Sequence, residues 1–285
     1  MDTGVTHRQH YVWRKYLSQW ATPKSSEGMV YCEMFGQSKK RINLTKICLE
    51  NDMYQLQKLN DEEIKIILYI AKTKIEIVDQ SNEEWVRKNQ EFFQMKEALL
   101  SLDHTEETKK KLEDLENSTG EELQSSFETL LPELVWNSLF QQKQDFLLDI
   151  DKRILFAQYL SSQYFRTANM RDIVVQKIED AKRLFGKGTE IDGIRIWKVL
   201  QNVLGTVTSY QLSAEPLFKL FFLSAPAGKT FITSDQPIIN LCKSDETTGE
   251  VDSFDLYYPI SPSLALIYSK NSFGEEKQIL SDEKN

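Results

Sequence analysis

Two hydrophobic periods divide this chain. Through most of residues 45–130, apolar side chains recur every three or four positions, which is the period of amphipathic helices. After residue 205 the pattern changes to short apolar runs separated by Gly, Pro, Ser and Asp, which is typical of strands. These runs are KTFITS, PIINL, DLYYPIS and SLALIYSK. Helices in the middle of the chain and strands toward its ends indicate an α+β protein.

A β-hairpin is expected near the N-terminus. Its arms are Met29–Phe35 and Lys39–Leu44, and Gly36 opens the turn, because a residue without Cβ tolerates a positive φ. We therefore expect a predominantly helical α+β fold with a small, mostly antiparallel sheet that the hairpin and the C-terminal strands build together. The predicted organisation is a single domain over residues 1–285, with a helical excursion at 45–130 and a C-terminal strand region at 205–285.

Two further helices and one helix start can be placed. A long helix is expected over residues 145–184 with a break near Thr167, and another runs from Ile194 to about Leu204. The segment NSTGEE is expected to interrupt the helical region and to begin a new helix. Ser118 or Thr119 can cap that helix, and acidic residues follow in its first turn.

The acidic balance of the chain argues against binding nucleic acid through bulk positive charge. Its 285 residues carry a formal net charge of -8, whereas such binding needs many Lys and Arg side chains to neutralise phosphates. A local basic patch remains open beside the interpretation that the basic residues are solvated charges. Its candidates are Lys39, Lys40 and Arg41 together with Arg14 and Lys15.

Cysteine usage and the N-terminus indicate a compartment. Cys32, Cys48 and Cys242 are far apart and odd in number, so the sequence shows neither a disulfide framework nor a CxxC metal motif. This fits a reducing compartment. No apolar run approaches the length of a membrane helix, and the opening MDTGVTHRQH has no apolar signal-peptide region. We therefore expect a cytoplasmic protein without membrane contact.

Familiar site motifs are incomplete. AGKT at residues 227–230 resembles the end of a phosphate-binding loop, but the first glycine of that motif would fall at Leu223 and an expected strand follows. A hairpin turn is the better interpretation. His7 and His10 have a spacing that suits a metal, but no nearby Cys or acid completes a ligand set. We therefore expect neither a metal nor a cofactor.

The segment FAQYLSSQYFRTANMRDIVV places an arginine on an apolar face. At about 100° per residue, Leu160, Tyr164 and Ala168 lie along one face of a continuous helix, and Arg171 falls among them. An unpaired buried charge is costly. Arg171 is therefore either a structural residue paired with an acid such as Asp235, or part of an anion site.

A polar cluster lies beside that face. Gln163, Arg166 and Thr167 are three and four positions apart, so they are neighbours on a helix. The planar guanidinium of arginine can hold a phosphate or carboxylate through two parallel hydrogen bonds. Arg166 is therefore a second candidate for an anion site.

Four stretches form a recognisable series. HYVWRKYLSQW, QYFRTANMR, FITSDQPII and YYPISPSLALIYS follow one another over nearly the whole chain. The series resembles a bacterial family known as domain of unknown function 4238. The corresponding family motifs are HYVPxxYLxxF, Q-x-x-R-T-P-x-x-R, TSD-x-P-V and PLSP-x-x-A-L. Trp13 and Ala168 stand where the family has proline.

The resemblance implies a set of site residues but no chemistry. The recurrent polar residues of the family fall on His10, Tyr16, Gln163, Arg166, Thr167, Arg171, Ser234 and Asp235. Members resemble accessory proteins of bacterial genomes, some of them near phage-defence genes. In the family, an Asn-containing helix and a last strand follow the LAL strand, whereas this sequence ends at ILSDEKN.

The first functional hypothesis is a metal-independent phosphodiesterase or nuclease-like hydrolase that acts on RNA or a nucleotide. A phage-defence effector is one role that such an enzyme could have. His10 would be its acid–base group, because only histidine titrates near neutral pH without perturbation. Arg166 and Arg171 would stabilise phosphate charge, and Asp235 would orient His10. The expected substrate-binding residues are Tyr16, Gln163, Thr167 and Ser234.

Two alternatives remain open. The same residues can form a non-catalytic sensor module that binds a phosphate or nucleotide without turnover. Alternatively, His10, Arg171 and Asp235 form a buried polar network that locks the terminal sheet onto the central helix. The enzyme and sensor hypotheses require these residues to converge at a cleft that solvent reaches. A protein partner on the helical region 60–130 is a further option, beside a purely solvated surface.

Overall fold

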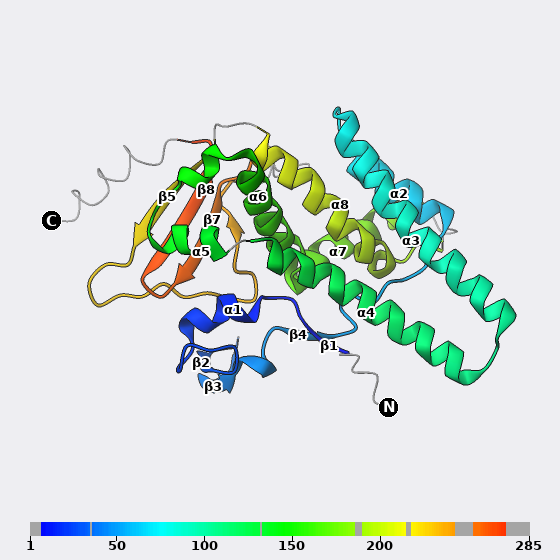
Figure 1. The fold of residues 1–285 in the computed structure, drawn as a ribbon, viewed down its shortest axis with the longest axis horizontal. Helices are drawn as coiled ribbons and strands as arrows, with labels where there is room; N and C mark the ends of the chain where they lie inside the picture. The colour runs from blue at the N-terminus through cyan, green and yellow to red at the C-terminus, as the bar shows by residue number, and fades with distance from the viewer. Residues whose placement is uncertain are drawn as a thin grey trace. The chain divides into compact units, whose positions relative to one another are not determined.

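Helices make up most of this protein (Figure 1). The computed structural model describes residues 7–34, 36–131, 133–185, 190–214, 218–242 and 253–271. Its strands are short and antiparallel. The predicted fold class, a predominantly helical α+β protein, is confirmed. None of the described helices combines the length and the apolar character that a membrane span requires.

The chain divides into two compact units. The first comprises Met1–Val12, Cys48–Leu130 and Gln158–Tyr210. The second comprises Trp13–Ile47, Leu131–Ala157 and Gln211–Asn285. Each unit is therefore built from three separated stretches of sequence. Whether they form one folding domain, as the sequence suggests, stays a prediction.

Long helices dominate the first unit. They are α2 (Asp61–Ala71), α3 (Glu76–Leu102), α4 (Glu106–Leu130), the second half of α6 (Ile150–Phe165), α7 (Ala168–Phe185) and most of α8 (Gly193–Ser213). Apolar side chains at helical spacing meet in one core, which includes Ile67 of α2, Val86 of α3 and Leu200 of α8. Burying such side chains stabilises the unit by roughly 1.5–3 kcal/mol each.

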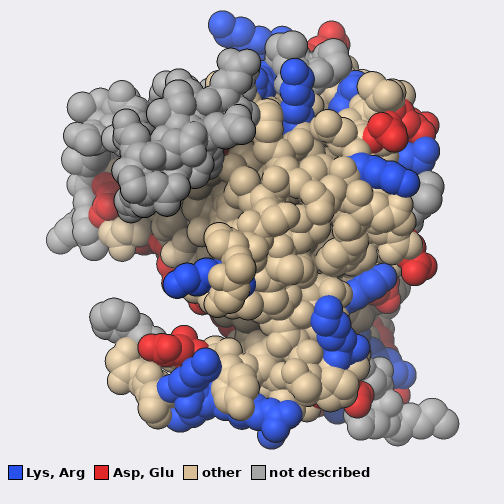
Figure 2. All heavy atoms as spheres, turned by 90° about the vertical axis from the view of Figure 1, so that its left-hand side faces the viewer, with Lys and Arg blue, Asp and Glu red and all other residues tan. Residues whose placement is uncertain are grey.

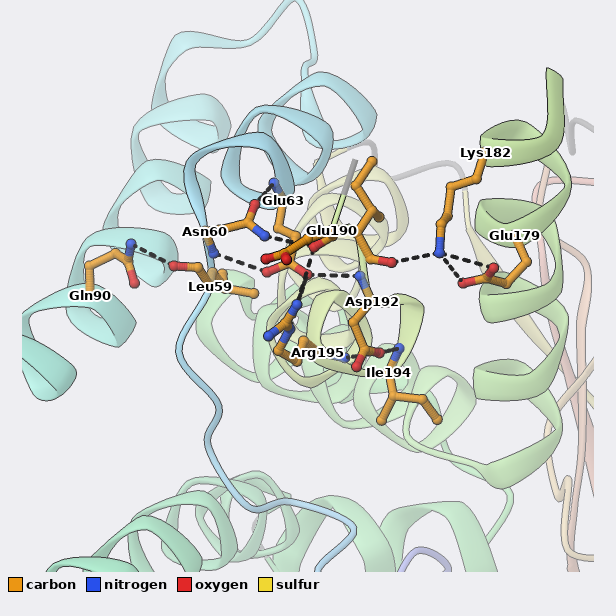
Figure 3. A network of polar contacts seen from close by, with 11 residues as sticks. Leu59, Asn60, Glu63, Gln90, Glu179, Lys182, Glu190, Asp192, Ile194 and Arg195 are labelled. Atoms are coloured by element: carbon orange, nitrogen blue, oxygen red, sulfur yellow. Dashed lines mark hydrogen bonds and ion pairs between the residues drawn. The ribbon is translucent and has the colours of Figure 1, made fainter. Parts of the chain in front are cut away.

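A buried carboxylate joins two of these helices (Figure 3). Asn60 and Glu63 form a capping box at the start of α2, in which each side chain accepts a hydrogen bond from the other's backbone N–H. Glu63 Oε1 also accepts from the backbone N–H of Asp192 at 2.8 Å and from Arg195 Nε at 3.0 Å. The start of α2 is thereby tied to the start of α8.

A two-stranded sheet completes the first unit. Strand β1 (Arg8–His10) pairs with β4 (Leu49–Asn51), and His10 lies opposite Leu49. The sequence places a helix in the stretch that contains β4, and this prediction is wrong. A turn follows β4, and the next helix begins only at Asp61. Residues 45–60 are therefore not part of the helical excursion expected at 45–130.

The second unit holds a four-stranded antiparallel sheet in the order β5-β8-β7-β6. The strands are β5 (Lys219–Ser224), β6 (Ile239–Asn240), β7 (Leu256–Ser261) and β8 (Leu264–Ser269). All residues of β8 are buried, which explains why its sequence is almost continuously apolar. Beside the sheet, Tyr268 contacts Phe156 edge to face at 5.4 Å between ring centres.

The second unit also contains several short helices and strands. They are α1 (Arg14–Leu17), η1 (Ser18–Trp20), β2 (Met29–Cys32), β3 (Lys40–Asn43), η2 (Leu44–Lys46), α5 (Glu133–Phe140) and η3 (Asp145–Leu148). Strands β2 and β3 form the expected hairpin, and Gly36 has a φ of 73° in its turn. Phe35, expected in the first arm, lies outside the described residues.

The N-terminal hairpin and the C-terminal strands do not share a sheet. The described strands form three separate sheets, β1-β4, β2-β3 and β5-β8-β7-β6. The expectation of one common sheet is therefore corrected. Strands β2 and β3 pair with each other along their whole length, and Met29 of β2 forms a further bridge with Thr22.

Helix boundaries also differ from the predictions. The break near Thr167 is confirmed, because α6 ends at Phe165 and α7 begins at Ala168. Helix α4 runs through NSTGEE without interruption, so the predicted new start is wrong. A Cβ on Gly120 would lie 1.8 Å from the backbone oxygen of Tyr54, so this glycine serves close packing instead of a break.

The C-terminal strand region begins later than expected. Helix α8 continues to Ser213, so the first residues of the stretch 205–285 are helical. KTFITS is not a strand, whereas β7 and β8 fall within DLYYPIS and SLALIYSK as predicted. AGKT lies at a turn, in which Lys229 N donates to the oxygen of Pro226 at 3.0 Å.

Charged side chains are dispersed on one face of the molecule. Figure 2 shows the side that carries α5, β5 and the β2-β3 hairpin, and uncharged side chains fill most of its described part. Lys and Arg side chains occur there in small groups, several of them beside Asp or Glu. The described residues of this face therefore form no broad basic surface for a nucleic-acid backbone.

Candidate ligand-binding site

A polar pocket lies within the first unit. Its volume is about 160 Å³, and helices α3, α4, α6 and α8 supply the wall together with Arg166, which follows α6. The lining residues are Ser81, Trp85, Gln124, Gln158, Ser162, Arg166, Gln201, Asn202, Gly205, Thr206 and Ser209. Amide and hydroxyl groups thus outnumber apolar groups on the wall.

Two carboxamide oxygens of the wall have no hydrogen-bond partner among the described residues. Gln124 and Gln201 are each only 4% exposed, and their Oε1 atoms are buried. Gln124 Nε2 donates to Asn202 Oδ1 at 3.0 Å, and Gln201 Nε2 lies 3.5 Å from the oxygen of Lys198. A buried acceptor without a partner costs about 1–3 kcal/mol, so these two side chains lower the stability of the helix packing around the pocket.

Hydrogen bonds also fix Trp85 and Thr206 of the wall. Trp85 Nε1 donates to Thr206 Oγ1 at 3.1 Å, and Thr206 Oγ1 donates to the backbone oxygen of Asn202 at 3.0 Å. These bonds hold the indole of α3 against α8. The indole therefore gives the pocket a rigid, flat side.

Arg166 and Gln163 come together as the sequence suggests. Arg166 is 3% exposed, and its Nε donates to the backbone oxygen of Tyr11 at 3.1 Å. A terminal nitrogen of Arg166 donates to Gln163 Oε1 at 2.9 Å, and Gln163 Nε2 donates to the same Tyr11 oxygen at 3.2 Å. The cluster thus holds the chain after β1 and places a guanidinium on the pocket wall.

Gly205 leaves open space beside the pocket. It lies inside α8, where glycine costs about 0.5–1 kcal/mol relative to alanine. A Cβ built at this position would meet nothing within 4 Å, so packing does not require a glycine here. Its observable effect is to keep the pocket wider.

Thr167 and Arg171 have local roles. Thr167 Oγ1 accepts a hydrogen bond from Met170 N at 3.4 Å in the first turn of α7. Arg171 forms ion pairs with Glu50 and, at 2.8 Å, with Asp172. The expectation that Arg171 lies on the apolar face of one continuous helix is wrong, because the helix breaks before it. The acids that pair with Arg171 are thus Glu50 and Asp172, whereas the sequence suggests either an acid such as Asp235 or an anion site.

Lys198 interacts electrostatically with both members of the ion pair between Arg171 and Glu50. Its Nζ donates to the backbone oxygens of Asp52 and Met53, each at 2.6 Å. Burial disfavours the charged ammonium and, as the largest cause, lowers the pKa of Lys198 to about 8. The charge of Glu50 opposes this shift, and the charge of Arg171 adds to it.

His10 and Tyr16 lie in different units. His10 is half-buried on β1 of the first unit, and its backbone oxygen accepts from Tyr54 Oη at 3.1 Å. Tyr16 is fully buried in the second unit. Its Oη donates to the backbone oxygen of Pro259 at 2.8 Å, and its ring stacks on Tyr258 at 4.9 Å between ring centres.

Ser234 and Asp235 form an exposed turn of the second unit. Ser234 Oγ accepts from Gln236 N at 3.1 Å and lies 2.9 Å from the oxygen of the same residue. Thr233, just before them, shares a 2.6 Å hydrogen bond with Tyr16 Oη, so Tyr16 and this turn are brought together. The convergence of Asp235 with His10 stays a prediction.

Sequence motifs missed most of the pocket, because amide and hydroxyl residues belong to no motif. One signal was present on α8. Gln201, Gly205 and Ser209 are four positions apart, and Asn202 and Thr206 repeat the same spacing, which makes a polar stripe on an otherwise apolar helix. Among the described residues, no group of three or more His, Cys, Asp or Glu is arranged to hold a metal ion.

The fold and the pocket define a class of mainly helical α+β protein with a polar cavity between helices. The sequence matches the family described as "Protein of unknown function (DUF4238)" over residues 8–283. The chain therefore belongs to the DUF4238 family. No curated protein and no solved structure matches it.

Proposed function

We propose that this protein is a non-catalytic binding module for a small polar molecule of the nucleotide class. The observation that carries the proposal is the pocket wall of the first unit. It combines the guanidinium of Arg166 with amide and hydroxyl side chains of α3, α4, α6 and α8. A ligand with both acceptor and donor groups matches this wall.

The chemistry of the wall favours binding over turnover. Among the described residues that line it, Arg166 is the single charged side chain, and none is His, Asp, Glu, Lys, Cys or Tyr. General acid–base catalysis needs a group whose pKa lies near the operating pH, and a serine or threonine nucleophile needs a base beside it. The lining residues supply neither. They can hold and orient a molecule.

Filling the pocket tests the proposal. In Gly205→Leu, a long side chain grows into open space, and leucine is a good helix former, so the fold should persist. We expect calorimetric titration of the wild type with AMP, CMP, GMP and UMP to show at least one saturable interaction. Gly205→Leu should abolish it, whereas the matched Gly205→Ala variant should retain it. Failure of all four nucleotides, or binding that Gly205→Leu leaves intact, contradicts the proposal.

The phosphodiesterase hypothesis stays a prediction, as does a role in phage defence. It requires His10 of the first unit and Asp235 of the second unit to act together. We expect no turnover of RNA or of mononucleotides by the purified wild type. Turnover that both His10→Ala and Asp235→Ala remove would favour the hydrolase and overturn the binding-only proposal.

A protein partner on residues 60–130 also stays a prediction. Two apolar side chains of α3 support it, because Ile77 is 70% exposed and Leu102 is 84% exposed. Co-purification of a defined complex that Leu102→Lys disrupts would test it.

A further inference from the structure

We infer that the protein forms a dimer in which α3 pairs, antiparallel and with two-fold symmetry, with α3 of a second copy of this chain. The inference goes beyond the proposed function, because it concerns the outer face of α3 and not the pocket. It is carried by the side chains that this face exposes and by their order along the helix.

One face of α3 is open to solvent from its first turn to its last. At about 100° per residue, the following residues lie within about 80° of one another around the helix axis: Ile77, Glu84, Lys88, Glu91, Met95, Leu99 and Leu102. Ile77 is 70% exposed and Leu102 is 84% exposed, and Met95 and Leu99 are also exposed. Single exposed apolar side chains are ordinary, but several on one helix face are typical of a contact surface.

The order of the side chains on this face is self-complementary. The face begins with one apolar side chain, continues with three charged ones and ends with three apolar ones. Ile77 and Leu102 are equally far from a point near the middle of α3, and Lys88 and Glu91 are equally far from the same point. A two-fold axis through that point therefore brings Ile77 opposite Leu102 of the second copy, and Lys88 opposite Glu91 of the second copy.

Charge selects the antiparallel direction. In the antiparallel pair, each Lys88 faces a Glu91, and the contact occurs twice because of the symmetry. A parallel pair would bring Lys88 against Lys88 and Glu91 against Glu91, which is repulsive. Within one chain, Lys88 lies 3.4 Å from Glu84, and Glu91 pairs with Arg87. These exposed ion pairs contribute little to stability, so they can exchange partners when two copies meet.

The size of the face predicts a weak dimer. Helix α3 has 27 residues, so it is about 40 Å long, and a helix with its side chains is about 10 Å wide. The contact strip is thus on the order of 400 Å² per copy, whereas a standard stable interface buries about 800 Å² per partner. Charged side chains also fill its middle. We therefore expect a dissociation constant on the order of 10–100 μM.

Sedimentation equilibrium of the full chain tests for the dimer. Between about 2 μM and about 500 μM protein, the average mass should rise from that of one chain toward that of two. Lys88→Glu sets two Glu side chains against each other at both symmetric contacts, so it should weaken dimerisation at least tenfold, an expected change of about 1.4 kcal/mol or more. Glu91→Lys sets two Lys side chains against each other and should have the same effect.

The double variant and a matched control make the test specific. Lys88→Glu combined with Glu91→Lys restores opposite charges across the axis, so its dissociation constant should return to within about threefold of the wild-type value. Lys110→Glu is the control, because Lys110 is exposed and lies about 160° around α4 from the buried Leu112. It should dimerise like the wild type. Circular dichroism and cooperative unfolding establish that each variant is folded.

Chemical crosslinking tests the register. In Ile77→Cys combined with Leu102→Cys, the two positions are about 37 Å apart along one helix, so a short bis-maleimide cannot join them within a chain. The antiparallel pair should yield a dimer whose crosslinked peptides join position 77 to position 102. The wild type, with its three native cysteines, gives the background.

Several results would overturn the inference. A mass of one chain at every concentration rejects the dimer. A dimer that both charge reversals leave intact, or that the double variant fails to restore, rejects the contact between Lys88 and Glu91. Crosslinks that join position 102 to position 102 instead of position 77 reject the antiparallel direction.

Discussion

Glu63 shows how one buried charge is stabilised in this fold. Its side chain is fully buried, and it accepts hydrogen bonds from two backbone N–H groups and from Arg195 (Figure 3). A buried carboxylate without partners would cost several kcal/mol. Because these donors come from the starts of α2 and α8, the same contacts also fix two helices of the pocket-bearing unit.

Replacing this carboxylate should destabilise the protein. We expect Glu63→Ala to lower the free energy of unfolding by about 2–3 kcal/mol, since charge-assisted hydrogen bonds are lost and Arg195 loses its ion-pair partner. The control is Glu62→Ala, whose exposed partner Lys65 predicts a change within about 0.5 kcal/mol. Urea denaturation at neutral pH measures both. Equal effects of the two substitutions would contradict the structural role of Glu63.

Lys198 predicts a dependence of stability on pH. Its pKa is lowered to about 8 from an ordinary value of 10.5, so between these values the folded protein has released a proton that the unfolded chain keeps. Stability should therefore rise with pH across this window. Measured by denaturation, the stability of the wild type relative to Lys198→Met should increase from about pH 7.5 to about pH 10. A constant or falling difference would show that Lys198 remains charged in the folded protein.

At the residue scale, the sequence singled out Arg166 but not the other residues that line the pocket. Arg166 and Gln163 share a helix turn, so their contact follows from spacing alone. Gln124 reaches the pocket from α4, and Gln201 reaches it from α8. Their proximity depends on how the helices pack, which helical periodicity does not specify.

Two glycines inside helices should respond in opposite ways to alanine. Gly205→Ala places a methyl group in open space, so it should raise the free energy of unfolding by about 0.5–1 kcal/mol. Gly120→Ala places it 1.8 Å from the backbone oxygen of Tyr54, so it should lower the same free energy by about 1–3 kcal/mol. Thermal and urea denaturation of both variants test the pair. Two changes of the same sign would show that helix propensity, and not packing, decides the outcome.

At the element scale, period and turn residues predicted most helices and the β2-β3 hairpin but missed strand β4. The long helices α3 and α4 follow from repeated three and four spacing. Strand β4 is only three residues long and its partner β1 lies about forty residues earlier, so no local pattern marks it. The sequence predicts a break at NSTGEE, because the close approach of Gly120 to Tyr54 is a tertiary contact that the sequence does not show.

At the scale of the whole molecule, both units depend on the last third of the chain. The core of the first unit takes Ile196, Leu200 and Val203 from α8. The strands of the four-stranded sheet all lie between Lys219 and Ser269. A fragment that ends before α8 therefore lacks essential parts of both units.

We accordingly expect a fragment of residues 1–192 to lack cooperative unfolding. Its helical segments cannot bury their apolar faces without α8, and isolated helices are marginal in water. Circular dichroism during heating should show a broad, shallow change for the fragment and a sharp transition for the full chain. A sharp transition in the fragment would mean that α8 is dispensable for folding.

The interleaving of the two units also has a consequence during synthesis. A ribosome delivers the chain from its N-terminus, so β1, α2, α3 and α4 emerge well before α8. Until Ser209 has left the exit tunnel, the pocket lacks one wall and the apolar faces of the earlier helices have no core to join. A nascent chain stalled before that point would present these faces to chaperones and to other unfinished chains.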